Sequence, residues 1–492
     1  MMDAVLNFFK TVNTYLSDYV LIILLVGTGL FFTIRTRFVQ VRCFGEGIKQ
    51  VFGGIFSKKK DRGHGLSSFQ ALATAIAAQV GTGNIVGASG AILIGGPGAI
   101  FWMWVIAFLG MATNYAEAVL AQKTRKVEGE HVFGGPVYYI KYAFKGVFGK
   151  ILAFIFATAT VLALGFMGLM VQSNSIAESF SNAFGIPSGY NWIIGLVLVA
   201  LCALLFFGGV KRLASVTEKL VPFMAIAFLI CGFVILCIRI RYIPATFGMI
   251  FRYAFAPNAL IGGGIGIAIK TAVSQGAKRG LFSNEAGMGS TPHAHAMASV
   301  EYPHQQGIAA MIGVFIDTFL VLTMTALVII STLYCEGGIL YNLSGDAYQA
   351  AISGPMAVIS KTDAMQQAVS SAFGSIGGVS IGNIFVAICL LFFAFSTIIC
   401  WNFFGKLNAQ YLFKNNKVLV IIYSSISILC VFLGTVLSND LVWELTDFFN
   451  YLMVLPNVIA LIALSRLVVF ETKEAKLRRK SSQVSKKQNK KR

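Results

Sequence analysis

The chain has 492 residues, of which 57% are hydrophobic and 12% are charged, and its mean hydropathy is +0.76. This composition excludes an ordinary soluble globular protein and indicates a helical protein that crosses a membrane several times. The net charge of +19 could suggest a nucleic-acid-binding protein, but the basic residues stand beside apolar segments, as in the cytoplasmic loops of membrane proteins. We therefore expect no nucleic-acid partner.

Hydropathy predicts eleven membrane-spanning segments. In chain order they cover about residues 17–35, 66–94, 97–121, 150–181, 190–208, 216–238, 256–280, 308–334, 380–404, 416–437 and 442–468.

Loop charge predicts the orientation of these segments. The Lys- and Arg-rich loops at 36–65, 122–150, 209–219 and 405–417 fall on one side together with the C-terminal tail, and the positive-inside rule makes that side cytoplasmic. Arg239, Arg241 and Arg252 are exceptions on the outer side. We expect a multi-pass protein of the cell inner (plasma) membrane with its N-terminus outside and its C-terminus in the cytoplasm.

The predicted spans divide the chain into three parts. Residues 1–65 hold an N-terminal membrane helix and a basic segment whose apolar residues at 40–57 recur near helical spacing, which predicts a helix along the inner membrane surface. Residues 66–468 form a core of ten helices. Residues 469–492 are polar and basic, so we expect a disordered cytoplasmic tail that is attracted to anionic lipid. The eight cysteines occur singly and are interpreted as packing residues.

A polar, glycine-rich cluster lies in the middle of the span at 66–94. It consists of Gln79, Gly81, Thr82, Gly83 and Asn84. Lipid cannot satisfy freed backbone groups, so such a cluster is tolerated where it lines a cavity enclosed by protein. Unwound backbone can hold a small zwitterion and a cation. Glycines alone could serve close helix packing, but these polar neighbours favour a binding site.

A second interruption is predicted at residues 261–267, where four glycines occur within the span at 256–280. Counted from the first interrupted span, this is the sixth core helix. Two breaks five helices apart are typical of an inverted five-plus-five repeat. No strand precedes either glycine run, so phosphate binding is not expected. Without a catalytic triad or paired carboxylates, we expect no enzymatic activity.

Several ordered motifs are similar to those of a known family. They are Ser68–Leu72, Val80–Asn84, Gly95–Trp104, Gly280–Ser290 with Pro292–His295, Phe315–Thr318, and Ala394–Thr397 with Trp401. Over residues 20 to 465 the chain resembles the alanine or glycine:cation symporters, which are sodium-coupled amino acid carriers. The resemblance implies an all-α polytopic fold with a LeuT-like core of five plus five inverted helices and one extra N-terminal helix.

The resemblance also implies a substrate site on the unwound backbone near Gly81 to Asn84. Other helices would complete the pocket with Gln172, Asn174, the glycines at 262–266 that include Gly264, Thr397 and Trp401. Thr397 and Trp401 are spaced i, i+4 and therefore share a helix face. Where we expect an aromatic residue in alanine carriers this chain has Gly264, so glutamine is a candidate substrate beside alanine and glycine.

An oxygen-rich set of groups is expected to bind Na⁺, the predicted coupling ion. It comprises the backbone carbonyls of Ala77 and Val80 and the hydroxyls of Ser396 and Thr397, because hard cations prefer oxygen ligands. The two hydroxyls could instead bond back to carbonyls of their own helix.

Charged residues within spans leave alternatives open. An intramembrane carboxylate such as Asp317 is functional by default, but a structural pair with Lys270 or Lys278 fits equally well. Glu117 is expected at the membrane interface. His293 and His295 are expected in a cytoplasmic loop or gate without a bound metal.

The sequence therefore predicts a secondary active transporter. It would import a small neutral amino acid by symport with Na⁺, alternating its access around two broken helices. A channel would need a continuous polar pore, which the scattered polar residues do not suggest. A proton-coupled amino acid carrier, with Asp317 or Glu117 as the relay, is the closest alternative.

Overall fold

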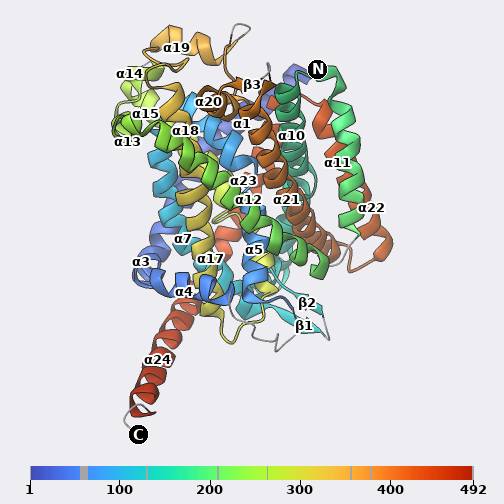
Figure 1. The fold of residues 1–492 in the computed structure, drawn as a ribbon. Coiled ribbons are helices and arrows are strands. Elements are labelled where there is room, and N and C mark those ends of the chain that lie inside the picture. The colour runs from blue at the N-terminus through green and yellow to red at the C-terminus, as the bar shows by residue number, and fades with distance from the viewer. Residues whose placement is uncertain are drawn as a thin grey trace.

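The computed structural model describes residues 2–55, 65–128, 131–207, 210–262, 264–354, 357–376 and 379–489. Long helices run side by side in one bundle (Figure 1). One end of the bundle carries α19 (Gly345–Ile352), α20 (Ala364–Phe373) and the hairpin β3 (Ser375–Ile376)–β4 (Val379–Ser380). The other end carries α4 (Phe44–Ile55) and the antiparallel hairpin β1 (Lys126–Glu128)–β2 (His131–Phe133). We call these the α19 end and the α4 end.

The remaining elements follow the predicted spans closely. In chain order they are α1 (Met2–Tyr15), η1 (Leu16–Leu21), α2 (Ile22–Arg35), α3 (Val39–Arg42), α5 (Ser68–Gln79), η2 (Gly83–Gly87), α6 (Ala88–Gly95), α7 (Ala99–Thr124), α8 (Pro136–Ala143), α9 (Val147–Leu162), η3 (Ala163–Met167), α10 (Gly168–Phe184), η4 (Ser188–Tyr190), α11 (Asn191–Phe206) and α12 (Val210–Ile238). They continue with η5 (Ile240–Tyr242), α13 (Ile243–Phe255), α14 (Asn258–Ile261), α15 (Ile265–Asn284), α16 (Pro292–Ala296), α17 (Pro303–Val314), η6 (Phe315–Leu322), α18 (Thr323–Leu333), α21 (Ile381–Leu412), α22 (Lys417–Val436), α23 (Asn439–Ala463) and α24 (Ser465–Asn489).

Ten of the eleven predicted spans are confirmed as long apolar helices. Nine continuous helical segments of the described chain are long and apolar enough to cross a membrane, and α5 with η2–α6 is a tenth that bends by 48°. The predicted span at 256–280 differs. Its place is taken by the four-residue α14 and by α15, whose charged residues Lys270, Lys278 and Arg279 make it too polar to qualify by hydropathy.

The first helix break lies where it was predicted. The side chain of Ser67 accepts a hydrogen bond from the Gln70 amide and starts α5, which ends at Gln79. The chain continues as the π-helical turn η2 from Gly83. π-Helical turns lack the regular i→i−4 bonding of an α-helix and often occur at functional sites. Residues 71–93 are buried around this break.

The predicted interruption at residues 261–267 is present between α14 and α15, but the second buried break lies elsewhere. Gly262, with φ +80°, ends α14 there, but α14 packs against α19 at one end of the bundle. The buried break separates α15 from α16, where Glu285, Gly287 and Gly289 adopt φ values of +57°, +91° and +82°. A glycine run shows where backbone can bend, but it does not show depth in the bundle. The polar residues Asn284 and Glu285 beside glycines were the better sequence signal of a buried break.

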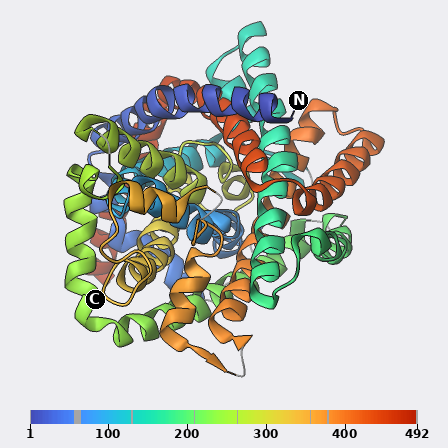
Figure 2. The same cartoon turned by 90° about the horizontal axis from the view of Figure 1, so that it is seen from above.

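The chain's two ends lie outside the core of the bundle. Helix α1 runs across the edge of the bundle and contacts α23 (Figure 2). Helices α3 and α4 lie across the α4 end and make most of the predicted segment at 40–57 helical, up to Ile55. Residues 56–64, with Lys58, Lys59, Lys60 and Arg62, lie outside the described residues. The tail predicted to be disordered from residue 469 instead continues as helix α24 to Asn489, projecting from the bundle. Its Glu474 and Arg478 form an i, i+4 ion pair that favours helix.

Candidate transport site

The break between α5 and η2 touches two other core helices. The amide of Thr82 donates a 3.1 Å hydrogen bond to Gln172 Oε1 on α10, and the amide of Gly81 donates one to Asn84 Oδ1. A Cβ atom on Gly81 would collide with Thr397 Oγ1 on α21 and lie 3.1 Å from Gln172 Oε1. Glycine is therefore required here by close approach, and three helices meet at the unwound segment.

Asn84 connects this break to the buried carboxylate of Asp317. Its Nδ2 donates to Asp317 Oδ1 at 2.7 Å, while Ser283 Oγ and Thr318 Oγ1 donate to Asp317 Oδ2 at 2.8 and 2.9 Å. Asp317 lies in the π-helical segment η6 and is fully buried. The structural pair with Lys270 or Lys278 that the sequence left open is wrong, because those lysines bind other carboxylates.

The second break is held by Glu117, a residue expected at the membrane interface. Glu117 is instead fully buried and accepts hydrogen bonds from the amides of Gly287 and Gly289 and from Asn457 Nδ2, at 3.2, 3.0 and 2.6 Å. The Glu117 carboxylate accepts hydrogen bonds from amides that have no partner within a helix. It thereby replaces the helical hydrogen bonds that the unwound chain has lost. Gln79 Nε2 joins the two breaks by donating to the carbonyl of Asn284 at 2.7 Å.

Glu285 is a site residue that sequence reasoning missed. Its carboxylate accepts a 2.6 Å hydrogen bond from Trp401 Nε1 on α21 and another from Ser290. The ring of Trp401 packs on Gly168, where a Cβ atom would lie 2.5 Å from ring carbons. Trp401 is thereby fixed beside the second break. The signal was present in the sequence as a glutamate within the glycine-rich motif Gly280–Ser290.

The two histidines are buried in α16 rather than placed in a loop. His293 Nδ1 lies 2.7 Å from the Ser290 carbonyl, and its Nε2 lies 2.8 Å from Asn408 Nδ2. His295 Nδ1 lies 2.8 Å from Gln306 Nε2. Both rings therefore support the packing of the helix after the second break.

The structure brings most of the predicted cation ligands together. Thr397 Oγ1 lies 3.0 Å from the Ala77 carbonyl, and Ser396 Oγ lies 3.3 Å from the same oxygen. Both hydroxyls also bond back to the Phe393 carbonyl of their own helix, so the two alternatives coexist. The described contacts do not include the Val80 carbonyl. The carbonyl and hydroxyl oxygens, which here contact no carboxylate, fit a monovalent hard cation.

Three predicted substrate residues carry buried polar atoms for which the described residues offer no hydrogen-bond partner. These atoms are Gln79 Oε1, Thr82 Oγ1 and Gln172 Nε2. A buried polar group without a partner costs about 1–3 kcal/mol. A polar ligand that bonds to them would therefore recover free energy.

Two predicted substrate residues are not brought to this site. Asn174 Nδ2 donates to the carbonyls of Gly434 and Leu437 and thereby ties α10 to the end of α22. Gly264 is exposed at the start of α15, and a Cβ atom there would meet nothing within 4 Å. The prediction that Gly264 widens the pocket does not hold in this conformation, because the glycine run lies one helix length from the second break.

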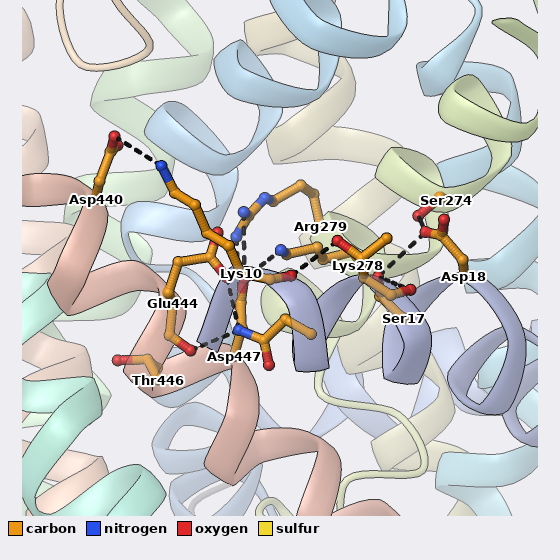
Figure 3. A network of polar contacts seen from close by, with 12 residues as sticks. Lys10, Ser17, Asp18, Ser274, Lys278, Arg279, Asp440, Glu444, Thr446 and Asp447 are labelled. Atoms are coloured by element: carbon orange, nitrogen blue, oxygen red, sulfur yellow. Dashed lines mark hydrogen bonds and ion pairs between the residues drawn. The ribbon is translucent and has the colours of Figure 1, made fainter. Parts of the chain in front are cut away.

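Ion pairs between α15 and α23 lie two turns or less from the second break, toward the α19 end. Lys278 Nζ and Arg279 Nη2 approach Asp447 Oδ2 at 2.8 and 3.3 Å, and all three residues are buried (Figure 3). The Arg279 guanidinium also lies over the Trp443 ring, which packs against Phe282. In contrast, Lys270 binds Asp18 at 2.8 Å and is exposed.

A cavity of about 480 Å³ opens on the opposite side of the site, toward the α4 end. It is lined by the start of α5 and by parts of α11, α12 and α21, including Leu66, Leu213, Ile399, Asn402 and Lys406. Asn402 lies just over one turn beyond Thr397 on α21. The site is therefore covered by ion pairs on one side and neighboured by a cavity on the other.

Residues 2–490 match the model of the sodium:alanine symporter family. The chain is similar to the sodium/alanine symporter AgcS of Methanococcus maripaludis, with 40% identity over 472 residues that cover 94% of this chain and 96% of that protein. It is also similar to a Bacillus subtilis protein named "Probable sodium/glutamine symporter GlnT", with 37% identity over 465 residues that cover 94% and 89%.

Solved structures with a similar fold include MhsT in complex with L-phenylalanine. The TM-score is 0.56 at 16% identity, and the match covers 84% of this chain and 99% of that one. A manganese transporter of Eremococcus coleocola matches with a TM-score of 0.50 at 15% identity over 85% and 86% of the chains. These matches confirm the predicted LeuT-like fold.

Proposed function

Because this chain belongs to the sodium:alanine symporter family, we propose that it imports a small neutral amino acid together with Na⁺. Its relatives are membrane transporters rather than enzymes, and the family implies sodium-coupled amino acid symport.

The observation that carries this proposal is the meeting of two unwound helices around buried polar atoms without partners. The break at Gly81–Asn84 offers backbone groups, and Gln79, Thr82 and Gln172 offer the unpartnered atoms. Such groups match the carboxylate and ammonium of a zwitterion better than an apolar or highly charged molecule. Trp401 then forms the wall that the side chain of the substrate contacts.

Alanine and glycine are the leading substrates, with glutamine as a further candidate. Gly264 gives no reason to favour glutamine, since that glycine is exposed and distant from the break. The name of the similar Bacillus subtilis protein keeps glutamine in consideration. Competition of labelled alanine uptake by glycine, serine and glutamine distinguishes these substrates.

Alternating access would connect the site to one side of the membrane at a time. The Asp447 ion pairs cover the α19 side, which we take as the outside, and the cavity near Asn402 provides a route toward the cytoplasm. This orientation keeps the basic α4 end in the cytoplasm, with the N-terminus outside, in agreement with the positive-inside rule. The basic tail would then lie near anionic lipid of the inner surface.

Na⁺ would couple to the substrate through the first break. The Ala77 carbonyl belongs to the same helix as Gly81, so an ion bound with Ser396 and Thr397 stabilises the unwound backbone that contacts the amino acid. By linkage, the substrate must then raise the affinity for Na⁺ equally. The buried carboxylates near the two breaks, Asp317, Glu285 and Glu117, favour proton coupling as the second candidate function.

Ser396→Ala in purified protein tests the ion site. The variant should need at least about tenfold more Na⁺ for half-maximal alanine binding, since one ligand is lost. Ser427→Ala is the matched control, because Ser427 is a buried serine that bonds only to its own helix. Unchanged Na⁺ dependence in Ser396→Ala would remove this hydroxyl from the ion site.

A further inference from the structure

Three metal-ligating side chains meet at the α4 end of the bundle, away from the transport site. Cys43 lies between α3 and α4, Glu46 lies in the first turn of α4, and His304 lies in the first turn of α17. A sulfur, a carboxylate oxygen and an imidazole nitrogen from these residues all lie within 4.8 Å of one another. The sequence did not suggest this cluster, because His304 is far from the other two residues along the chain.

We propose that Cys43, Glu46 and His304 form a binding site for Zn²⁺. A thiolate, an imidazole and a carboxylate together are ligands that Zn²⁺ accepts, whereas Na⁺, Mg²⁺ and Ca²⁺ prefer sites made of oxygen alone. Three protein ligands leave a fourth tetrahedral position for water.

The distance between Glu46 and His304 suits a tetrahedral site after a small contraction. Glu46 Oε2 lies 3.8 Å from His304 Nε2. Ligands bonded to zinc at about 2.0–2.2 Å in a tetrahedron are roughly 3.3–3.6 Å apart. A shift of a few tenths of an ångström therefore brings this pair to bonding geometry.

Residues around the cluster orient the His304 ring. Its Nδ1 lies 2.7 Å from the Tyr115 hydroxyl, which in turn lies 2.9 Å from Thr472 Oγ1. If the Nδ1–H group donates a hydrogen bond to the Tyr115 hydroxyl, the lone pair of Nε2 faces Glu46 and Cys43. Metal-bound histidines commonly have such a partner on the other ring nitrogen.

Burial and position are consistent with reversible binding. Cys43 and His304 are buried, while the Glu46 side chain retains 23% of its exposure and leaves a route for entry. Helix α4 packs against α17, and Tyr115 lies on α7. A bound ion would therefore fasten the peripheral helix pair α3–α4 to the core of the transporter.

Cobalt binding to the purified, chelator-treated full-length protein tests this site. Co²⁺ replaces Zn²⁺ and reports a thiolate ligand by a charge-transfer band in the near ultraviolet. We expect the band in the wild type and its removal by excess Zn²⁺. Cys43→Ser should abolish the band, and Cys237→Ser, which removes an exposed cysteine on α12, should keep it.

Two further measurements guard against a folding defect. Glu46→Gln changes a partly exposed side chain and should weaken Co²⁺ affinity at least about tenfold, since even an outer partner of a metal ligand contributes that much. Zn²⁺ should raise the thermal unfolding temperature of the wild type but not of Cys43→Ser. A wild type without the band, a Cys43→Ser protein that keeps it, or loss of the band in Cys237→Ser overturns the proposal.

Discussion

Gly81 is the residue on which three helices converge, so it should tolerate no side chain. Gly81→Ala would press a methyl group against Thr397 Oγ1 and Gln172 Oε1, displacing a proposed cation ligand and a residue of the proposed substrate site. Overpacking of this kind costs about 1–3 kcal/mol. We expect roughly a tenfold or greater loss of Na⁺-dependent alanine binding at unchanged expression.

Gly87→Ala provides the control for this prediction. Gly87 is a buried glycine of the same broken span, and a Cβ atom there would lie 3.8 and 3.9 Å from its nearest neighbours, which is ordinary contact. Gly87→Ala should therefore bind alanine like the wild type. Equal binding by both variants would show that close approach at Gly81 is unimportant for the site.

At the residue scale, the sequence predicted the polar residues of the first break better than their partners. Gln79, Thr82 and Asn84 stand out because polar side chains interrupt an apolar span. Asp317 was ambiguous, since the sequence does not show that η6 turns its carboxylate toward Asn84 rather than toward a lysine. Such pairings depend on how helices pack, which sequence spacing within one helix does not determine.

At the scale of elements, the buried ion pairs between α15 and α23 share one carboxylate. Asp447→Asn would leave the buried charges of Lys278 and Arg279 without their partner, and breaking such a pair costs about 3–5 kcal/mol. We expect a clear fall in the thermal unfolding temperature in detergent. Asp440 is an exposed residue near the start of the same helix, α23. Asp440→Asn removes only its longer pairs with Lys10 and Lys361.

Asp440→Asn should change stability by no more than about 0–1 kcal/mol, as is usual for exposed pairs. If both variants unfold at the same temperature as the wild type, the buried ion pairs do not fasten α15 to α23. If Asp440→Asn is the more damaging change, the exposed pairs of α23 with α1 and with the loop before α20 contribute more to stability than the buried pairs do.

The loop before α20 predicts a pH dependence above neutrality. Burial, followed by the positive charge of Arg279, lowers the pKa of Lys361 from 10.5 to about 8. Between these two values the unfolded chain binds the proton that the folded protein has lost, so stability should rise as pH increases from about 8 toward 10.5. Below pH 8 the folded protein must hold the buried charge, and this gain is absent.

Unfolding temperatures measured across this range check the prediction. Lys361→Met should flatten the rise, while Lys10→Met, which removes the other lysine near Asp440, should keep it. The account of Lys361 is wrong if the slope of unfolding temperature against pH is the same in wild type and Lys361→Met.

Elements with a continuous apolar pattern were predicted well, and interrupted ones were not. Helix α21 has no charged residue before Lys406 and a long apolar run, so its position follows directly from hydropathy. Helix α15 carries three basic residues and ends in a polar break, so its pattern suggested a span shifted toward the glycines at 261–267. The basic residues of α15 pair with carboxylates on α23 and η1. In the sequence alone, without these partners, they look like the end of a span.

At the scale of the whole molecule, a bundle of long helices could be predicted because membrane depth limits the possible elements. Two predicted interruptions five helices apart then indicated the inverted repeat, and the family resemblance implied its LeuT-like form. The helix α24 could not be predicted in this way, since its sequence is polar and its helicity depends on local side-chain pairs such as Glu474 with Arg478.

The central claim is that a Na⁺ gradient drives amino acid import, and transport into proteoliposomes tests it most directly. Purified protein should accumulate labelled alanine when Na⁺ is high outside and low inside. Replacement of external Na⁺ by choline at constant pH should abolish that accumulation, because the Ala77, Ser396 and Thr397 oxygens would lose their cation. Undiminished accumulation driven by a proton gradient without Na⁺ would contradict the account and assign coupling to the buried carboxylates.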